Sequence, residues 1–151
     1  MLIDVVTIFP SMLAGFIGES MIKRAAEKGI IKFRFINPRD FTTDSHKTVD
    51  DTPYGGGPGM VMKPEPLWKA VESARDEDAY VILMGPRGRR FEQSIAVDLT
   101  KKKHIIFICG HYEGVDERVR IGLANDEISI GDYVLSNGVV AAAVVIDAVV
   151  R

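Results

Sequence analysis

The stretch that most constrains this chain runs from residue 126 to residue 151 and reads DEISIGDYVLSNGVVAAAVVIDAVVR. From Val139 to Val150 it predicts a helix that is apolar on almost every side, with Asp147 as its one interior charge. A helix that is apolar all round has to be covered on every side. It is too short to cross a bilayer, which takes roughly 20 residues. The fold must therefore wrap this helix with the rest of the domain, with a second copy of the chain, or with both.

Strand-like and helix-like segments alternate ahead of this helix. Apolar runs predict strands at residues 2–9, 31–36, 80–84, 105–109 and 128–130. Between them, helical spacing of apolar residues predicts helices around Phe16–Ala25, Leu67–Ala74 and Ile95–Leu99, and a short one that ends at Leu123. This order predicts a single α/β domain over residues 1–151, with a mostly parallel sheet covered by helices on both faces.

The bulk composition excludes a few classes of protein. A formal net charge of −2 argues against broad, non-specific binding to nucleic acid, which needs a basic surface. A local basic patch is still open, with Arg87, Arg89, Arg90 and Lys101–Lys103 as its candidates. Cys109 is the only cysteine, so no disulfide can form within the chain. The sequence shows no leader pattern and no membrane span, and we expect a cytoplasmic location.

Three of the predicted strands end in loops that contain glycine. These loops are Met84-Gly85-Pro86, Cys109-Gly110-His111 and Ile130-Gly131-Asp132. In open α/β sheets, ligands bind beyond the carboxyl ends of the strands. Each glycine taken alone is explained by a tight turn, but the three loops together predict a pocket of backbone N–H and C=O groups that suits an adenine or a ribose.

Several common sites are not supported. The chain has no phosphate-binding loop of the G-x-x-x-x-G-K-[ST] type and no G-x-G-x-x-G after a strand. His46, His104 and His111 have no metal-ligand spacing with Cys109 or with the carboxylates, so no metal site is predicted. His104 is expected to be the first residue of a strand. For His111 the sequence does not decide between a structural and a functional role.

The segment from residue 37 to residue 62 breaks the alternating pattern. It contains Tyr54-Gly55-Gly56-Gly57-Pro58-Gly59-Met60, preceded by His46-Lys47-Thr48-Val49-Asp50-Asp51. Long irregular segments of compact domains are usually functional or disordered. The glycines allow a close approach to a bulky ligand, and the neighbouring base, cation and acids make a plain linker a weaker explanation.

The chain resembles a known family at these residues. The matching stretches are Pro38-Arg39-Asp40-Phe41, residues 46–60, Gly110–Arg118 and residues 129–136. They are similar to the bacterial tRNA (guanine-N1)-methyltransferases, usually called TrmD, of the knotted SPOUT superfamily. The resemblance implies a deep trefoil knot near the C-terminal side, S-adenosylmethionine as cofactor, and an obligate homodimer that methylates the guanine immediately 3′ of the anticodon.

The resemblance also assigns roles to individual residues. The implied cofactor pocket comprises Leu83, Met84, Gly85, Gly110, Tyr112, Gly114, Ile130, Gly131, Asp132, Tyr133, Val134, Leu135, Asn137 and Gly138. The tRNA or its guanine would contact His46, Asp50, Pro58 and Gly59 of the opposite subunit. Arg151 would support the guanine O6, where negative charge develops. Glu113 would lie near the methionine carboxylate and an Mg²⁺ ion. Asp50 or Asp132 is our own candidate for the base that takes the N1 proton, in place of the family's acceptor, which is expected after residue 151.

The chain departs from the family pattern in two ways. The family continues past Arg151 with a linker that carries the expected proton acceptor and with a helical domain that grips the anticodon arm. Loss of a general base typically costs on the order of 10²–10⁴-fold in rate. In addition, Asn137-Gly138-Val139-Val140 stands where the family has Gly-Gly-Glu-Leu. Two hypotheses follow: a methyltransferase domain of weak activity, or a catalytically impaired cofactor-binding dimer that acts on another RNA or partner.

Overall fold

The computed structural model describes residues 1–151 and contains a five-stranded sheet in which all neighbouring strands are parallel. The strand order is β2-β1-β6-β5-β7. The strands are β1 (Leu2–Val6), β2 (Lys32–Ile36), β5 (Ala79–Arg90), β6 (His104–Cys109) and β7 (Asp126–Ser129). A separate antiparallel ribbon is formed by β3 (Asp50–Asp51) and β4 (Val61–Met62). The predicted α/β class is confirmed.

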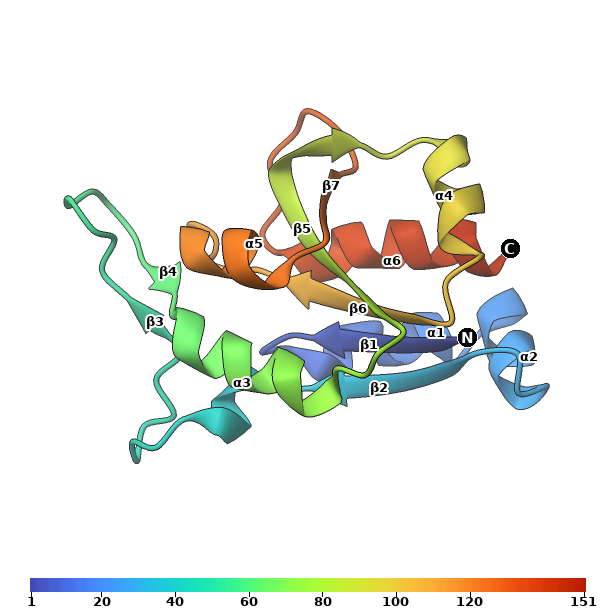
Figure 1. Cartoon of the computed structure of the whole chain (residues 1–151), viewed down its shortest axis with the longest axis horizontal. Helices are drawn as coiled ribbons and strands as arrows, with labels where there is room; N and C mark the ends of the chain where they lie inside the picture. Colours follow the sequence, from blue (N-terminus) through green and yellow to red (C-terminus); the bar gives the residue numbers. More distant parts are fainter.

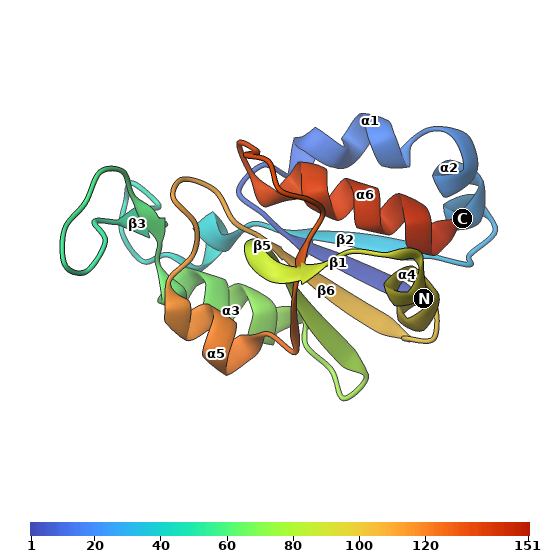
Figure 2. The same cartoon turned by 90° about the horizontal axis from the view of Figure 1, so that it is seen from above.

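Helices cover both faces of this sheet (Figures 1 and 2). On one face lie η1 (Pro10–Leu13), α1 (Ala14–Ile17), α2 (Ser20–Glu27), α4 (Gln93–Leu99) and α6 (Gly138–Val150); on the other lie α3 (Pro64–Ala74) and α5 (Glu117–Leu123). Alternate strand residues enter the two cores: Phe107 packs with α6, whereas Ile106 and Ile108 pack with α3. Because both faces are covered, the central strands are apolar at nearly every position.

The apolar helix α6 is wrapped largely within one chain. Its side chains at Ala142, Val145 and Ile146 are fully buried among the sheet and the neighbouring helices. Val140 and Val144, one turn apart, remain 42% and 45% exposed. The rest of the domain therefore covers most of the helix, as predicted, and cover of this narrow stripe by a second copy stays a prediction.

A buried charged cluster lies near the start of β6, in the half of the sheet where the strands begin. Asp4 in β1 is fully buried, and its carboxylate accepts a hydrogen bond from Arg34 Nε at 2.7 Å. His104 Nε2 lies 2.8 Å from Asp4, and His104 Nδ1 lies 2.9 Å from Asp76. His104 does open β6, as predicted, but the interpretation of residues 2–9 as a continuous apolar run overlooked this Asp.

Two strand boundaries differ from the prediction. β1 ends at Val6 instead of Phe9, because the chain turns into η1 at Pro10. β5 does not stop at Gly85 but runs on to Arg90, since its last residues pair with β7 a second time. The irregular segment after β2 contains only the short helix η2 (Pro38–Phe41) and the β3–β4 ribbon.

None of the helices has the length and apolar character that crossing a membrane would require. The trefoil knot implied by the resemblance stays a prediction.

Candidate functional site

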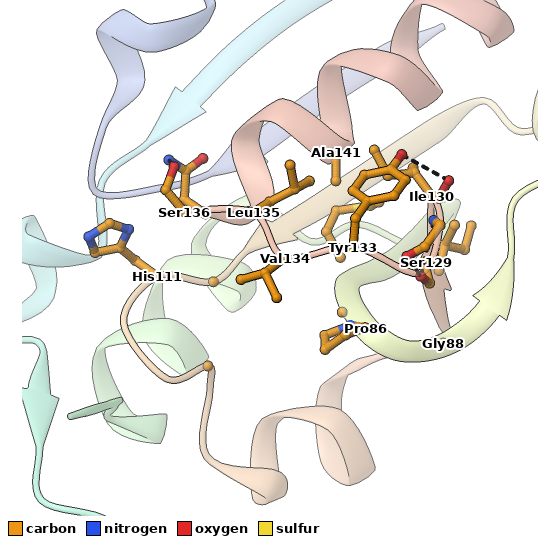
Figure 3. Close-up of a pocket in the computed structure, with 18 of the residues that line it drawn as sticks. Pro86, Gly88, His111, Ser129, Ile130, Tyr133, Val134, Leu135, Ser136 and Ala141 are labelled. Atoms are coloured by element: carbon orange, nitrogen blue, oxygen red, sulfur yellow. Dashed lines mark hydrogen bonds between the residues drawn. The ribbon is translucent and has the colours of Figure 1, made fainter. Parts of the chain in front are cut away.

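A cavity of about 840 Å³ opens where β5, β6 and β7 end, at one edge of the sheet (Figure 3). Three chain segments line it: residues 84–90, residues 110–114, and residues 128–141. These are the three glycine-bearing segments that the sequence predicted to converge. They meet because β6, β5 and β7 are adjacent and parallel, so their carboxyl ends lie at the same edge.

The first wall consists of residues 84–90 of β5, where the regular pairing with β7 is interrupted. The pairing of β5 with β7 shifts register between Met84 and Arg89, so the residues between them leave the ladder. A Cβ added to Gly88 would lie 2.4 Å from the carbonyl group of Glu127, and one added to Gly85 would lie 2.2 Å from the Glu127 carboxylate. The absence of side chains at both glycines lets this wall fold directly onto β7.

The second wall follows β6. Tyr112 adopts a positive φ of 59°, which costs a non-glycine residue on the order of 1–3 kcal/mol and is typical of ligand sites. The backbone N–H of Glu113 donates to the Met60 carbonyl at 2.9 Å, and the Gly114 carbonyl accepts from the Met62 N–H at 2.9 Å. These two bonds tie the second wall to the end of the glycine-rich segment 54–60.

The third wall leads from β7 into α6. The Asn137 side chain caps α6 by accepting a hydrogen bond from the Val139 N–H at 2.9 Å. The Gly138 N–H donates to the Gly110 carbonyl at 2.8 Å, and a Cβ on Gly138 would lie only 3.0 Å from Cys109 Cα. This backbone-to-backbone contact joins the second and third walls at the start of α6.

The third wall also presents unpaired backbone groups. From Asp132 to Ser136, no backbone N–H or C=O group hydrogen-bonds to another backbone group of the chain. All five residues line the cavity. Backbone polar groups that lack partners in the protein bond to water or to a ligand, so this loop can pair with the edge of a heterocyclic base.

Most of the residues that the sequence assigned to the cofactor line this cavity. They are Met84, Gly85, Gly110, Tyr112, Gly114, Ile130, Gly131, Asp132, Tyr133, Val134, Leu135, Asn137 and Gly138. Leu83 is the exception, because alternate residues of β5 point to opposite faces and its side chain packs in the core beneath α3.

The remaining predicted residues are not all assembled in one chain. Glu113 lines the cavity, and Gly59 packs against it so closely that a Cβ would lie 2.4 Å from the Glu113 Cγ. Asp50, in β3, does not line the cavity; neither do His46 and Pro58, which are exposed in the same irregular segment. Arg151 follows the far end of α6, about 20 Å along the helix axis from its start at the cavity.

The structure also shows the charges of the basic patch that the sequence left open. Arg87 pairs with Glu117, Arg89 with Asp126, Lys101 with Asp98 and Lys103 with Asp78. The patch is therefore largely neutralised by its own carboxylates. Hydrogen bonds from Arg120 and Arg87 hold the pKa of Glu117 below its ordinary value.

Sequence reasoning missed several lining residues. They are Gly88, Arg90, Ile128, Ser129, Ser136 and Ala141, and His111 was left open between two roles. The register shift inside β5 brings Gly88 and Arg90 to the cavity, and no local pattern encodes that shift. His111 packs its ring edge-on against Phe9 and Tyr112, with its Nδ1 buried and without a hydrogen-bond partner. Nowhere in the chain do three His, Cys, Asp or Glu side chains gather to hold a metal ion.

Sequence comparisons with known proteins identify the family of this chain. Residues 1–151 match the family described as tRNA (Guanine-1)-methyltransferase TrmD. The chain is 55% identical over 151 residues to a tRNA (guanine-N(1)-)-methyltransferase of Carboxydothermus hydrogenoformans, covering 100% of the chain and 60% of that relative. A protein of the same name from Dictyoglomus turgidum is 58% identical over 149 residues, covering 99% of the chain and 60% of that relative.

The chain thus spans about 60% of the length of these curated relatives. The match nevertheless covers the whole of this chain, including all three walls of the cavity. By its sequence, this chain belongs to the tRNA (guanine-1)-methyltransferase TrmD family.

Proposed function

We propose that this chain binds S-adenosylmethionine in the cavity and directs its methyl group to N1 of a tRNA guanine, the one immediately 3′ of the anticodon. The observation that carries the proposal is the third wall, where the backbone groups of residues 132–136 lack protein partners and line the cavity. Family membership adds the class of reaction, because the relatives are named tRNA (guanine-N(1)-)-methyltransferases.

The cavity suits the cofactor in size and in lining. Its volume of about 840 Å³ lies within the range of roughly 300–1,000 Å³ that is usual for small-molecule sites. Val134 is 99% exposed and Leu135 is 39% exposed, so apolar side chains remain available to cover an adenine ring. The loop backbone supplies the polar partners, and the bound cofactor would supply an electrophilic methyl group on sulfur.

The proposed binding site for the tRNA guanine lies next to Glu113. The contact of Gly59 with Glu113 places the glycine-rich segment at the rim of the cavity. A guanine held by His46, Asp50, Pro58 and Gly59 of the opposite subunit would meet the methyl donor across the dimer interface, and Asp50 or Asp132 would accept its N1 proton. An Mg²⁺ ion would take Glu113 as its protein ligand and substrate oxygens as the others, as Mg²⁺ commonly does.

We further propose that the chain works as a homodimer in the cytoplasm. The exposed Val140–Val144 stripe of α6 is the apolar surface that a second copy would cover. Arg151 lies too far along α6 to serve the cavity of its own chain. A partner subunit would bring a second Arg151, in a role at the guanine O6 where negative charge develops. The alternative of a catalytically impaired module is not favoured, because the relatives carry the name of the enzyme.

Two measurements test this proposal. Isothermal titration calorimetry with S-adenosylmethionine tests the cavity, and transfer of a labelled methyl group to a tRNA transcript tests the reaction. We expect Glu113→Ala to abolish transfer while the fold, measured by circular dichroism, is retained. A transcript with adenine in place of the target guanine is the control and should accept no methyl group.

The outcomes separate the parts of the proposal. An absence of heat on titration of the folded chain would contradict the cofactor site. Cofactor binding without any methyl transfer would contradict the enzymatic function and favour the impaired module. Sedimentation that gives the mass of one chain at micromolar concentration would contradict the homodimer.

A further inference from the structure

Arg90 is the only Lys or Arg among the residues that line the cavity. It is the last residue of β5 and of the first wall. The cavity also holds two carboxylates, Glu113 and Asp132. The side chains that line the cavity therefore include one cation and two acids.

The guanidinium of Arg90 has no partner in the chain. It makes no hydrogen bond and no ion pair, unlike its neighbour Arg89, which binds the Asp126 carboxylate through Nε and an Nη atom. Arg87 is likewise bound to Glu117. An arginine has five N–H donors in a planar fork that matches a carboxylate. At Arg90 this fork is free.

The backbone holds Arg90 at the cavity. Arg90 is paired with Ser129 in the sheet, and the N–H of the next residue, Phe91, donates to the Ser129 carbonyl at 2.8 Å. Successive strand residues point to opposite faces. Arg89 accordingly borders a second, smaller cavity, whereas Arg90 borders the cofactor cavity.

We propose that Arg90 binds the α-carboxylate of S-adenosylmethionine and so selects a cofactor that carries this group. The inference rests on the proposed function of the cavity. S-adenosylmethionine has two cationic groups, its ammonium and its sulfonium, and a single anionic group. Arg90 is the only Lys or Arg that lines the cavity, so it is the one side chain of opposite charge available to the carboxylate.

The test compares two ligands that differ in this one group. Calorimetric titrations use S-adenosylmethionine and its decarboxylated analogue with the unaltered chain, Arg90→Ala and Arg90→Lys. We expect the unaltered chain to prefer the carboxylated ligand about five- to tenfold, as fits a partly solvated ion pair. Arg90→Ala should abolish the preference by weakening only S-adenosylmethionine, and Arg90→Lys should restore part of it. Lys101→Ala removes one exposed charge outside the cavity and should leave both affinities unchanged.

Each outcome decides between the claims. If the unaltered chain binds both ligands equally, or if Arg90→Ala weakens both by the same factor, the role of Arg90 is refuted and the cofactor site stands. If Arg90→Ala leaves both affinities intact but weakens binding of the tRNA transcript, the anion that Arg90 binds is a phosphate of RNA and this inference is wrong. If the unaltered chain binds neither ligand, the proposed function fails together with the inference.

Discussion

The contact between Gly88 and β7 yields the sharpest test of the site. In Gly88→Ala, the new Cβ would lie 2.4 Å from the Glu127 carbonyl carbon and oxygen and 2.5 Å from the Ile128 nitrogen. Ordinary contact begins at 3.4 Å, so β5 and β7 must separate by about 1 Å. All three atoms belong to the backbone, so no side-chain rotation can relieve the clash. Overpacking of this kind costs about 1–3 kcal/mol of unfolding free energy.

Urea denaturation followed by circular dichroism measures this cost. With a denaturant slope of about 1–3 kcal/mol/M, the midpoint should fall by roughly 1 M. The affinity for S-adenosylmethionine should fall as well, because the displaced strand is the first wall of the cavity. Gly88→Ala with unchanged stability and unchanged affinity would refute the contact and the register shift that causes it.

Two other glycines serve as matched controls. A Cβ on Gly85 would meet the Glu127 carboxylate, which can rotate away, so Gly85→Ala should cost less than Gly88→Ala. A Cβ on Gly15, in α1, would have no other atom within 4 Å, and Gly15 has no positive φ. Gly15→Ala should therefore stabilise the chain by about 0.5–1 kcal/mol, through helix propensity alone.

Three further predictions concern stability. Asp4→Ala removes a fully buried carboxylate and leaves His104 Nε2 and the Arg34 guanidinium without this partner, so it should cost roughly 2–4 kcal/mol in urea denaturation without weakening cofactor binding at the opposite end of the sheet. Asn137→Ala loses the cap of α6 and should cost about 1 kcal/mol, whereas Asn137→Gly should cost only a few tenths; equal costs would contradict the cap. The hydrogen bond from Arg118 holds the pKa of Asp116 below its ordinary value of 3.8, so the stability from this pair is present above 3.8 and is lost as the pH falls through the lower folded-state pKa. Asp116→Asn keeps the cap of α5 and should therefore differ in urea midpoint from the unaltered chain at about pH 5, and this difference should shrink as the pH falls below 3.8.

Local patterns were sufficient for most of the secondary structure. Apolar runs of strand length at 80–84 and 105–109 lie within β5 and β6, and the interval 139–150 coincides with α6 to within one residue. These segments are predictable because burial on both faces requires apolar residues at every position of a strand. The boundaries that failed, at Phe9 and at Gly85, depend on where a neighbouring strand stops or resumes pairing.

The candidate site was only partly predictable. Glycine after a strand identified the three walls, and resemblance named most of the lining residues. The sequence placed Leu83 among them, although strand alternation turns its side chain to the other face. Arg90 was grouped with a basic patch, because its free guanidinium is visible only when the carboxylate partners of the other cations are known.

The sequence by itself determined an α/β chain with a parallel sheet, an apolar final helix and glycine-bearing loops after three strands. These features follow from local composition, since each depends on a few neighbouring residues. Only the tertiary structure decided that the loops share one cavity, that Asp4 is buried with His104, and that Arg90 faces the cavity unpaired. Such features depend on strand order and register, which bring together residues that are far apart in the chain and whose contacts no local pattern records.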